Sequence, residues 1–475
     1  KNLIKNHFNS LSSKRKEWID KAKGFYLEDI RAMKEFIPEN SKILEIGCGN
    51  GNLIAALRPS LGYGIDISEG MLAEAKKSYD NLHFIEGDIE DSNIINKIGE
   101  TFDFIILSDT IGYLNDIEKT FEKLHKVCNP DTRFIVSYYS PFWEPILNIA
   151  AKLNFKMQEL PKLLLNETDI SELLNSSGYE TVKKEKKIIF PFTAFGLGRI
   201  VNRFLSCLPI ISYFCIRNYV ISRSLKLSTK DLPKSASVII PCRNEKGNIR
   251  NALKRLPVFT KNLEVIFVEG HSKDGTWEEI NKVLADKSFI AKGFKMKAIQ
   301  QKGLGKADAV FQAFSLASND VLMILDADLT VPPEDLPKFW KKISTGQAEY
   351  VNGSRLVYLM ENDAMRLLNY IANKIFALLF TWLLGQRYTD TLCGTKVIRK
   401  RHYDMALKRN RDLGNFDPFG DFFIIFGASR LNLKMSEVPI KYRAREYGET
   451  QISRFSHGFL LLKMVIFAFF KLKAT

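Results

Sequence analysis

The chain has 475 residues, of which 45% are hydrophobic and 26% are charged, and its formal net charge is +15. This length is too great for one core and predicts about two to four domains, and the composition excludes a disordered chain. The positive charge calls for an anionic partner, which could be a nucleic acid, a phosphorylated substrate or an acidic lipid surface.

The six cysteines are scattered along the chain, without a Cys-x-x-Cys pair or the spacing of zinc ligands. This pattern favours a reducing compartment and argues against a zinc site. The first residues do not form a signal peptide, and no apolar run reaches the roughly 20 residues that span a bilayer.

A glycine-rich turn follows the first predicted strand of the first half. Residues 42–46 include the β-branched Ile43 and Ile46, and a turn with Gly47, Gly49 and Gly51 comes directly after them. Glycines let the backbone turn sharply and approach a ligand closely. A turn that binds a dinucleotide would have its third glycine at position 52, where this chain has Asn52.

Acidic residues follow the next predicted strands. The strand at residues 61–65 ends at Asp66, and the strand at 82–86 is followed by Asp88 and Ile89. Acids at successive strand ends line the crevice in which open α/β sheets bind their ligands. We therefore expect a doubly wound α/β domain with a ligand site at this edge.

This order of motifs resembles the class I S-adenosylmethionine-dependent methyltransferases over residues 1–190. The resemblance implies a Rossmann-like domain whose cofactor-binding residues are Glu45, Gly47, Gly49, Gly51, Asp66, Asp88 and Ile89. By resemblance, the glycine turn holds the methionine part, Asp66 the ribose hydroxyls, and Asp88 with Ile89 the adenine. No motif identifies the methyl acceptor. Asp109, Tyr113 and His125 are candidates on the acceptor side, although a structural role is favoured for each.

Residues 191–235 are a basic, aromatic-rich stretch that we interpret as a joint and linker between two domains. Short apolar pieces broken by prolines alternate there with arginines. Such a stretch can lie in a membrane interface. It can equally pack between two domains, and we favour that interpretation.

Two carboxylates end an apolar run in the second half. Residues 319–325 have the length and character of a buried strand, and Asp326 and Asp328 follow. If the strand continues through them, both side chains point the same way. Mg²⁺ or Mn²⁺ carrying a nucleotide diphosphate fits two such acids, because hard cations choose oxygen ligands.

The second half resembles family 2 glycosyltransferases of the GT-A fold over residues 236–455, and within them the dolichyl-phosphate mannose synthases. Six ordered motifs carry the resemblance: Pro241-x-x-Asn244-Glu245, Ser272-x-Asp274-Gly275-Thr276, Gly303-Leu304-Gly305, Asp326-Ala327-Asp328, Gly353-Ser354-Arg355 and Tyr442-x-x-Arg445-x-x-Gly448-Glu449-Thr450.

The resemblance implies a donor site and a metal site. The donor-binding residues it implies are Pro241, Asn244, Glu245, Glu269, Gly305 and Asp326, and the metal ligands are Asp326 and Asp328. Arg355 and Arg445 would contact phosphate oxygens through their forked donors. The chain departs from the family at Glu269-Gly270, where two aspartates are usual, and at Thr330, where a glutamine is usual.

The acceptor decides whether a general base is needed. Cleavage of the sugar–phosphate bond releases a diphosphate, whose charge a metal and basic side chains stabilise. A lipid-phosphate acceptor is already an anion, whereas a hydroxyl needs a carboxylate to take its proton. The candidate bases are Asp390 and Asp421, which complete the predicted catalytic set of Asp328, Arg355 and Arg445.

Two apolar segments bear on location. Residues 367–384 form an apolar helix with a polar stripe that includes Arg366, Asn369, Asn373 and Lys374, and the tail at 456–475 is apolar with interspersed lysines. Both are typical of helices that lie flat on an anionic membrane. The alternative is that they pack on the catalytic domain or on a second copy.

The sequence therefore predicts a bifunctional enzyme that uses S-adenosylmethionine, a divalent metal and a nucleotide-sugar donor in cell-envelope glycan synthesis. We expect inverting sugar transfer to a polyprenyl-phosphate or other lipid-linked acceptor, at the inner face of the cytoplasmic membrane. One alternative is a saccharide hydroxyl acceptor. Another is a nucleic-acid-binding methyltransferase with an inert second domain, but the basic residues form no platform with aromatic ones.

Overall fold

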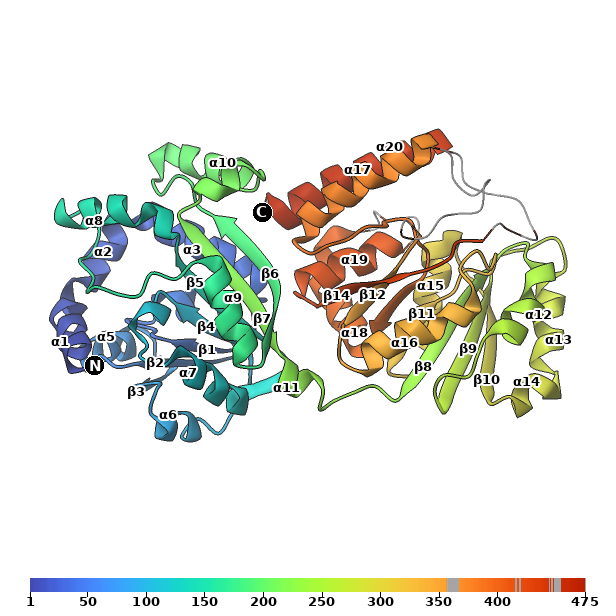
Figure 1. Ribbon diagram of the computed structural model, residues 1–475, viewed down its shortest axis with the longest axis horizontal. Helices are drawn as coiled ribbons and strands as arrows, with labels where there is room; N and C mark the ends of the chain where they lie inside the picture. The colour runs from blue at the N-terminus through green and yellow to red at the C-terminus, as the bar shows by residue number, and fades with distance from the viewer. Residues whose placement is uncertain are drawn as a thin grey trace. The chain divides into compact units, whose positions relative to one another are not determined.

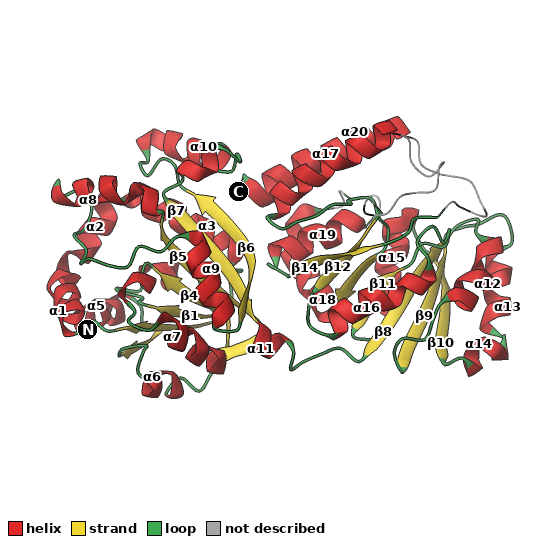
Figure 2. Cartoon of the chain, in the orientation of Figure 1, coloured by secondary structure: helices red, strands yellow, loops and turns green. Residues whose placement is uncertain are grey.

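The computed structural model divides into two compact units, Lys1–Asp231 with Lys473–Thr475, and Leu232–Leu472. The structure describes residues 1–355, 357, 367–414, 417, 420–443, 445, 447 and 454–474. Each unit has a central sheet flanked by helices (Figures 1 and 2). The α/β class and the two-domain architecture predicted from the sequence are confirmed.

The first unit is built on a seven-stranded sheet in the order β3-β2-β1-β4-β5-β7-β6. Its strands are β1 (Lys42–Ile46), β2 (Leu61–Asp66), β3 (His83–Glu86), β4 (Phe102–Ser108), β5 (Cys128–Tyr139), β6 (Tyr179–Lys187) and β7 (Arg217–Ser224). The strands from β3 to β5 pair in parallel, and β7 is antiparallel to both of its neighbours. Because β1, β2 and β4 pair in parallel, their carboxyl ends lie at one edge of the sheet.

Helices flank both faces of this sheet. They are α1 (Asn2–Leu11), α2 (Arg15–Lys21), α3 (Lys23–Phe36), α4 (Asn52–Ala56), α5 (Glu69–Ser78), α6 (Ser92–Asn96), α7 (Ile117–Leu124), α8 (Glu144–Lys152), α9 (Glu167–Ser176), α10 (Leu197–Phe204) and α11 (Leu225–Ser228). Alternate side chains of each strand enter different cores: Leu44 and Ile46 belong to one, and Ile43 to the other. Burial on both faces explains the apolar runs of central strands such as β4.

Strand β7 lies where the sequence predicted a joint. Residues 217–224 pair with both β5 and β6, so the first sheet extends well beyond residue 190. The strand was not predicted because it contains basic residues, which are unusual in a buried strand. Arg217 and Arg223 are 0% and 1% exposed, and their guanidinium groups pair with Asp29 and Glu180, respectively. Those acids are far away in the sequence, so the pairing leaves no local signal.

The second unit also has a seven-stranded sheet, in the order β10-β9-β8-β11-β13-β12-β14. Its strands are β8 (Ser235–Cys242), β9 (Asn262–Glu269), β10 (Phe294–Gln300), β11 (Val321–Ile324), β12 (Tyr350–Ser354), β13 (Lys396–Arg399) and β14 (Met435–Pro439). Strand β13 is antiparallel to β11 and β12, and the other neighbouring strands pair in parallel.

The helices of the second unit cover both faces of the sheet. They are α12 (Lys246–Arg255), α13 (Thr276–Leu284), α14 (Lys287–Ala291), α15 (Gly305–Leu316), α16 (Leu336–Ser344), α17 (Leu367–Leu384), α18 (Lys400–Arg409), α19 (Asp421–Arg430) and α20 (Arg454–Ala468). Two cores result: Val321 and Met323 of β11 face one, and Leu322 and Ile324 face the other.

Helices α17 and α20 lie side by side against one of these cores (Figure 1). Each buries one apolar face, which includes Phe380 in α17 and Met464 in α20. Each also exposes large apolar side chains, among them Leu378 at 74% and Phe459 at 73%. Helices α17 and α20 therefore pack on the protein with one face and present apolar side chains outward with another. In the described ranges, no helix is long and apolar enough to cross a membrane.

Candidate functional site

A cavity in the first unit is lined by the glycine-rich turn after β1. Gly47 and Gly49 both have positive φ, at +74° and +52°. A Cβ at Gly47 would lie 1.9 Å from Thr110 Oγ1, whereas one at Gly49 would meet nothing within 4 Å. Glycine is thus required for packing at Gly47 and leaves the cavity open at Gly49. Gly51 is the N-cap of α4 and shapes the turn from outside the cavity lining.

Two carboxylates, Asp66 and the buried Glu45, support this turn. Asp66 accepts hydrogen bonds from the backbone N–H groups of Gly49 and Ser68, each at 2.8 Å, and burial raises its pKa. Glu45 is 3% exposed and accepts a hydrogen bond from Ile54 N–H at 3.1 Å. Burial raises the pKa of Glu45 to about 8. Both side chains also line the cavity, which leaves them able to contact a ligand.

The cavity brings together further predicted residues and some that the sequence did not reveal. Asp88 and Ile89, which the sequence predicted to bind the cofactor, line it. Residues of the N-terminal helices, Arg15 and Tyr26 among them, line it as well. The Arg15 guanidinium lies 5.5 Å from the Tyr26 ring centroid and, among the described residues, makes no ion pair. A cation facing a ligand cavity suits a carboxylate, but a polar helix gives no sequence signal for it.

Two of the three acceptor-side candidates lie at the cavity, and the third does not. Asp109 and Tyr113 line the cavity, whereas His125 is a core residue that hydrogen-bonds Ser224 Oγ and the Ser177 carbonyl, each at 2.8 Å. Asp109 is paired with the buried Arg217 guanidinium, which fixes its carboxylate.

The cavity also fits the methyl donor implied by the sequence. The Tyr113 hydroxyl is buried without a hydrogen-bond partner in the described structure, and Gly49 leaves space for a bound group. An orphaned polar atom beside open space marks a place for a ligand.

The second candidate site lies at the carboxyl end of β11. That strand ends at Ile324, so Asp326 and Asp328 lie in the following turn, which a hydrogen bond from Leu329 N–H to the Asp326 carbonyl closes at 3.2 Å. The expected alternation along an extended strand therefore does not apply. Both side chains are partly exposed, at 26% and 15%, and neither points into a dry core.

Each of these acids has a cationic partner. Lys306 Nζ lies 2.6 Å from Asp326 Oδ1, and Arg445 NH2 lies 2.6 Å from Asp328 Oδ2. Burial pushes the pKa of Asp326 up, but the Lys306 ammonium outweighs it and leaves that pKa below its ordinary value. Lys306 was missed from the sequence because it follows the Gly303-Leu304-Gly305 motif and a lone lysine at a helix start is common.

The carboxylates fit a divalent cation if these partners move aside. Asp326 Oδ2 has no hydrogen-bond partner within the described residues, and a Cβ at Gly394 would lie 1.8 Å from it. Thr330 N–H and Oγ1 donate to Asp328 Oδ1, at 3.1 and 2.8 Å. Oxygen ligands of this kind suit Mg²⁺ or Mn²⁺.

The two candidate bases differ in availability. Asp390 forms a bidentate ion pair with Arg355, at 2.7 Å for both bonds, and accepts three backbone hydrogen bonds besides. This geometry assigns Asp390 to positioning Arg355 and argues against its prediction as a base. Asp421 lies 3.4 Å from Lys396 Nζ, and its buried Oδ1 has no partner within the described residues.

The predicted donor-binding residues differ in their hydrogen bonds, burial and position in the backbone. Asn244 and Glu269 hold the turn at 270–276: Lys273 N–H donates to Asn244 Oδ1 at 2.9 Å, and Ser272 N–H donates to Glu269 Oε1 at 2.5 Å. Glu245 is 8% exposed, and burial raises its pKa to about 7. Pro241 lies in β8, and Gly305 begins α15 with φ of +87°. Residues 448–450 of the last motif lie outside the described residues.

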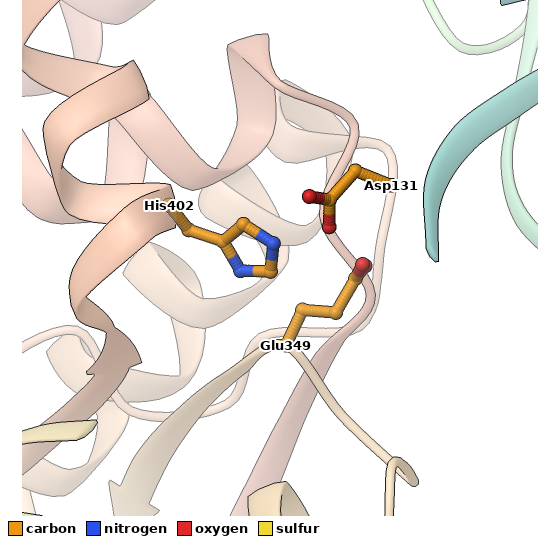
Figure 3. A group of neighbouring side chains, drawn as sticks. All are labelled: Asp131, Glu349 and His402. Carbon is orange, nitrogen blue, oxygen red and sulfur yellow. The ribbon is translucent and has the colours of Figure 1, made fainter. Parts of the chain in front are cut away.

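His402 and Glu349 lie beside one another within the second unit, as Figure 3 shows. His402 is in α18, after the antiparallel β13, and Glu349 precedes β12. Because Arg399 pairs with Val321 at the start of β11, these side chains lie at the edge opposite to Asp326 and Asp328. They are therefore not part of the candidate glycosyl-transfer site.

The fold and the two sites define a protein with two α/β ligand-binding domains, each with a polar site at its strand ends. Residues 37–189 match a family model described as a methyltransferase domain, and residues 237–416 match that of glycosyl transferase family 2. The chain thus joins a methyltransferase domain to a family 2 glycosyltransferase domain.

Curated relatives match parts of the chain. A dolichol-phosphate mannosyltransferase of Pyrococcus furiosus is 35% identical over 124 residues, which is 26% of this chain and 33% of that protein. An undecaprenyl-phosphate 4-deoxy-4-formamido-L-arabinose transferase of Salmonella newport is 25% identical over 224 residues, 46% of this chain and 63% of that protein. The chain thus spans less than two thirds of either relative.

Solved methyltransferase structures also match the chain. One is a possible histamine N-methyltransferase from Thermotoga maritima, with 18% identity and a TM-score of 0.35, which covers 47% of this chain and 99% of that chain. Another is the magnesium protoporphyrin IX methyltransferase of Synechocystis, with 17% identity and a TM-score of 0.32, which covers 47% and 99%.

Proposed function

We propose that the chain is a bifunctional transferase of cell-envelope glycan synthesis. Its second unit transfers a sugar, with inversion, from a nucleotide-sugar donor to a polyprenyl phosphate or another lipid-linked acceptor. Its first unit transfers a methyl group from S-adenosylmethionine. The observation that carries the proposal is the set of ion pairs around Asp326 and Asp328, in which Lys306 and Arg445 gather positive charge where a diphosphate would leave.

Basic side chains supply the stabilisation of the leaving group. As the sugar–phosphate bond breaks, negative charge grows on the diphosphate, and preorganised Lys306, Arg445 and Arg355 lower the energy of that state. Asp390 holds the Arg355 guanidinium in a fixed orientation through two hydrogen bonds. Asp326 and Asp328 would hold Mg²⁺ or Mn²⁺, which supplies further positive charge to the diphosphate when bound.

A polyprenyl-phosphate acceptor needs no general base, because its phosphate is already an anion. The two named relatives, a dolichol-phosphate and an undecaprenyl-phosphate transferase, support this acceptor class. The apolar outer faces of α17 and α20 support docking on an anionic membrane, at its cytoplasmic side, where a lipid-linked acceptor is presented.

A saccharide hydroxyl acceptor is the second candidate. The buried Oδ1 of Asp421, which lacks a partner within the described residues, favours it, because such an oxygen could accept the proton of an attacking hydroxyl.

In the methyltransferase unit, Gly47, Gly49, Asp66 and Asp88 would hold S-adenosylmethionine, which supplies an electrophilic methyl group when bound. Arg15 would pair with the carboxylate of the donor. Asp109, fixed by Arg217, would orient an acceptor hydroxyl and take its proton. Methyl transfer then depends mainly on alignment and on the exclusion of water.

A donor screen tests the proposal. Purified protein with Mn²⁺ or Mg²⁺ is incubated with UDP- and GDP-sugars and with undecaprenyl phosphate or free saccharides, and nucleotide release is measured. We expect release with one donor and the lipid phosphate, and at least a hundredfold loss in Asp328→Asn. No turnover with any donor, or turnover unchanged in Asp328→Asn, would overturn the assignment.

A further inference from the structure

The surface of the methyltransferase unit carries a cluster of exposed apolar side chains in the connection between β6 and β7. Their exposed fractions run from 57% to 112%, and they are Phe192, Phe195, Leu197, Ile200, Ile210 and Tyr213. Single exposed apolar residues are ordinary, but six large ones within one connection mark a candidate interaction surface. Neither the family matches nor the transferase sites account for this cluster.

The outward orientation of the cluster is fixed by polar contacts on its inner side. Asn202 of α10 accepts hydrogen bonds from the N–H groups of Ile189 and Phe190, at 3.0 and 2.9 Å, and donates to the Phe190 carbonyl at 2.8 Å. Gly198 faces inward as well, and a Cβ there would lie 1.9 Å from the Phe192 carbonyl oxygen. Helix α10 therefore cannot rotate to bury Ile200 without breaking these contacts.

The tip of the connection exposes an aromatic ring at a conformational cost. Phe195 has φ of +54°, in the left-handed region that is unfavourable for a side chain with a Cβ. Its ring is fully exposed, so packing within the described residues does not offset that strain. Burial of the ring in an external apolar medium would offset the strain.

The sequence of this connection carries only positive charges, although Lys186 at its start pairs with Glu167 outside it, at 3.4 Å. No aspartate or glutamate occurs between Glu185 and Asp231, whereas lysines and arginines recur throughout. Arg199 is exposed on α10, and the Lys186 ammonium lies 4.4 Å from the Tyr213 ring centroid. Aromatic and aliphatic side chains interspersed with basic ones are complementary to an anionic lipid interface.

We propose that residues 192–214 form a lipid-docking surface of the methyltransferase unit, which lies flat on an anionic membrane with Phe195, Ile200 and Ile210 in the interface. This surface belongs to the first unit, whereas the apolar faces of α17 and α20 belong to the second. It brings the methyl-donor cavity to the membrane, so the methyl acceptor belongs to the class of lipid-linked glycans. That last step rests on the proposed methyl transfer, whereas the docking itself does not.

The test uses the full chain with a single labelling site. Cysteine is introduced at Ile210, at Leu462 of α20 or, as a control, at Ile290 of α14, all of which are exposed positions. The six native cysteines are buried, so an environment-sensitive fluorophore labels the new one selectively. Emission is measured with vesicles of phosphatidylcholine alone and with added phosphatidylglycerol, and again with lipid-borne quenchers.

We expect a blue shift and quenching at position 210 with anionic vesicles, and no change at position 290. A response at 462 without one at 210 would overturn the proposal. So would a shift at 210 that depends on protein concentration without lipid, because that result means association of two copies.

A second measurement gives the contribution of these side chains to membrane binding. Phe195→Ser with Ile210→Ser should lower partitioning into anionic vesicles at least tenfold, because each buried apolar side chain is worth about that factor. Ile290→Ser is the matched control. Nucleotide release with a short-chain, water-soluble polyprenyl phosphate should be unchanged in the double variant, so a failure of docking is distinguishable from a failure of sugar transfer. Unchanged partitioning would also overturn the proposal.

Discussion

Replacement of Lys306 by Met tests whether the Lys306 ammonium group occupies the position at Asp326 that a metal ion would take. Lys306 Nζ and Asp326 Oδ1 are 2.6 Å apart, but both side chains are about a quarter exposed, at 25% and 26%. A fully buried pair costs about 3–5 kcal/mol when one partner is lost, and an exposed pair about 0–1 kcal/mol. For this intermediate case we take about 1–2 kcal/mol.

The same energy opposes metal binding, because a cation at Asp326 must displace the ammonium group. At about 1.4 kcal/mol for each factor of ten, Lys306→Met should bind Mn²⁺ roughly 5–30-fold more tightly in the absence of nucleotide-sugar. Its sugar-transfer rate should nevertheless fall, because the positive charge beside the leaving diphosphate is lost. The metal-free variant should also unfold more easily, by about 1–2 kcal/mol.

Mn²⁺ titration followed by electron paramagnetic resonance measures the affinity. Lys302→Met is the matched control, because Lys302 is an exposed lysine of the same turn. An affinity in Lys306→Met that equals or falls below that of the parent protein would show that Lys306 does not compete for the metal position.

Three further changes test other parts of the two sites. Burial raises the pKa of Glu45 to about 8 from an ordinary 4.5, so the folded state keeps a proton that the unfolded state has lost, and stability should fall by about 1.4 kcal/mol per unit as pH rises between these values. Glu45→Gln should flatten that fall, which thermal unfolding of the first unit from pH 5 to 8 measures; a slope like the parent's refutes the assignment. Asp421→Asn should abolish transfer to a saccharide hydroxyl but leave transfer to a lipid phosphate within a few fold, and equal losses in both assays would contradict a role as base. Gly394→Ala should reduce sugar transfer by at least tenfold, since its Cβ would lie 1.8 Å from Asp326 Oδ2; methyl transfer, measured in parallel, should not change.

The sequence was sufficient to locate those parts of the candidate sites that consist of local motifs. The turn at Gly47 and Gly49, the acids at or just after the ends of β2 and β3, and the paired acids after β11 all lie next to strands that the sequence predicted. The two domain families followed from these motifs and are confirmed by the family matches.

Features that depend on distant partners could not be predicted in this way. Strand β7 contains Arg217 and Arg223, which belong to a buried sheet only because Asp29 and Glu180 neutralise them across long sequence separations. Arg15 reaches the methyl-donor cavity from an N-terminal helix whose polar sequence does not indicate a ligand. Asp390 could be read as a base until its bidentate bond to Arg355 was seen.

The connection between β6 and β7 begins and ends at one point, because Ile216 N–H donates to the Ile188 carbonyl at 2.7 Å. Everything between these residues is an excursion from a hairpin in which Lys187 lies opposite Arg217. Such an excursion can be lengthened, shortened or exchanged between proteins while the sheet that carries Arg217 is preserved. Natural variation or engineering of this connection can therefore change which surface the first unit binds, while the residues of its candidate site stay the same.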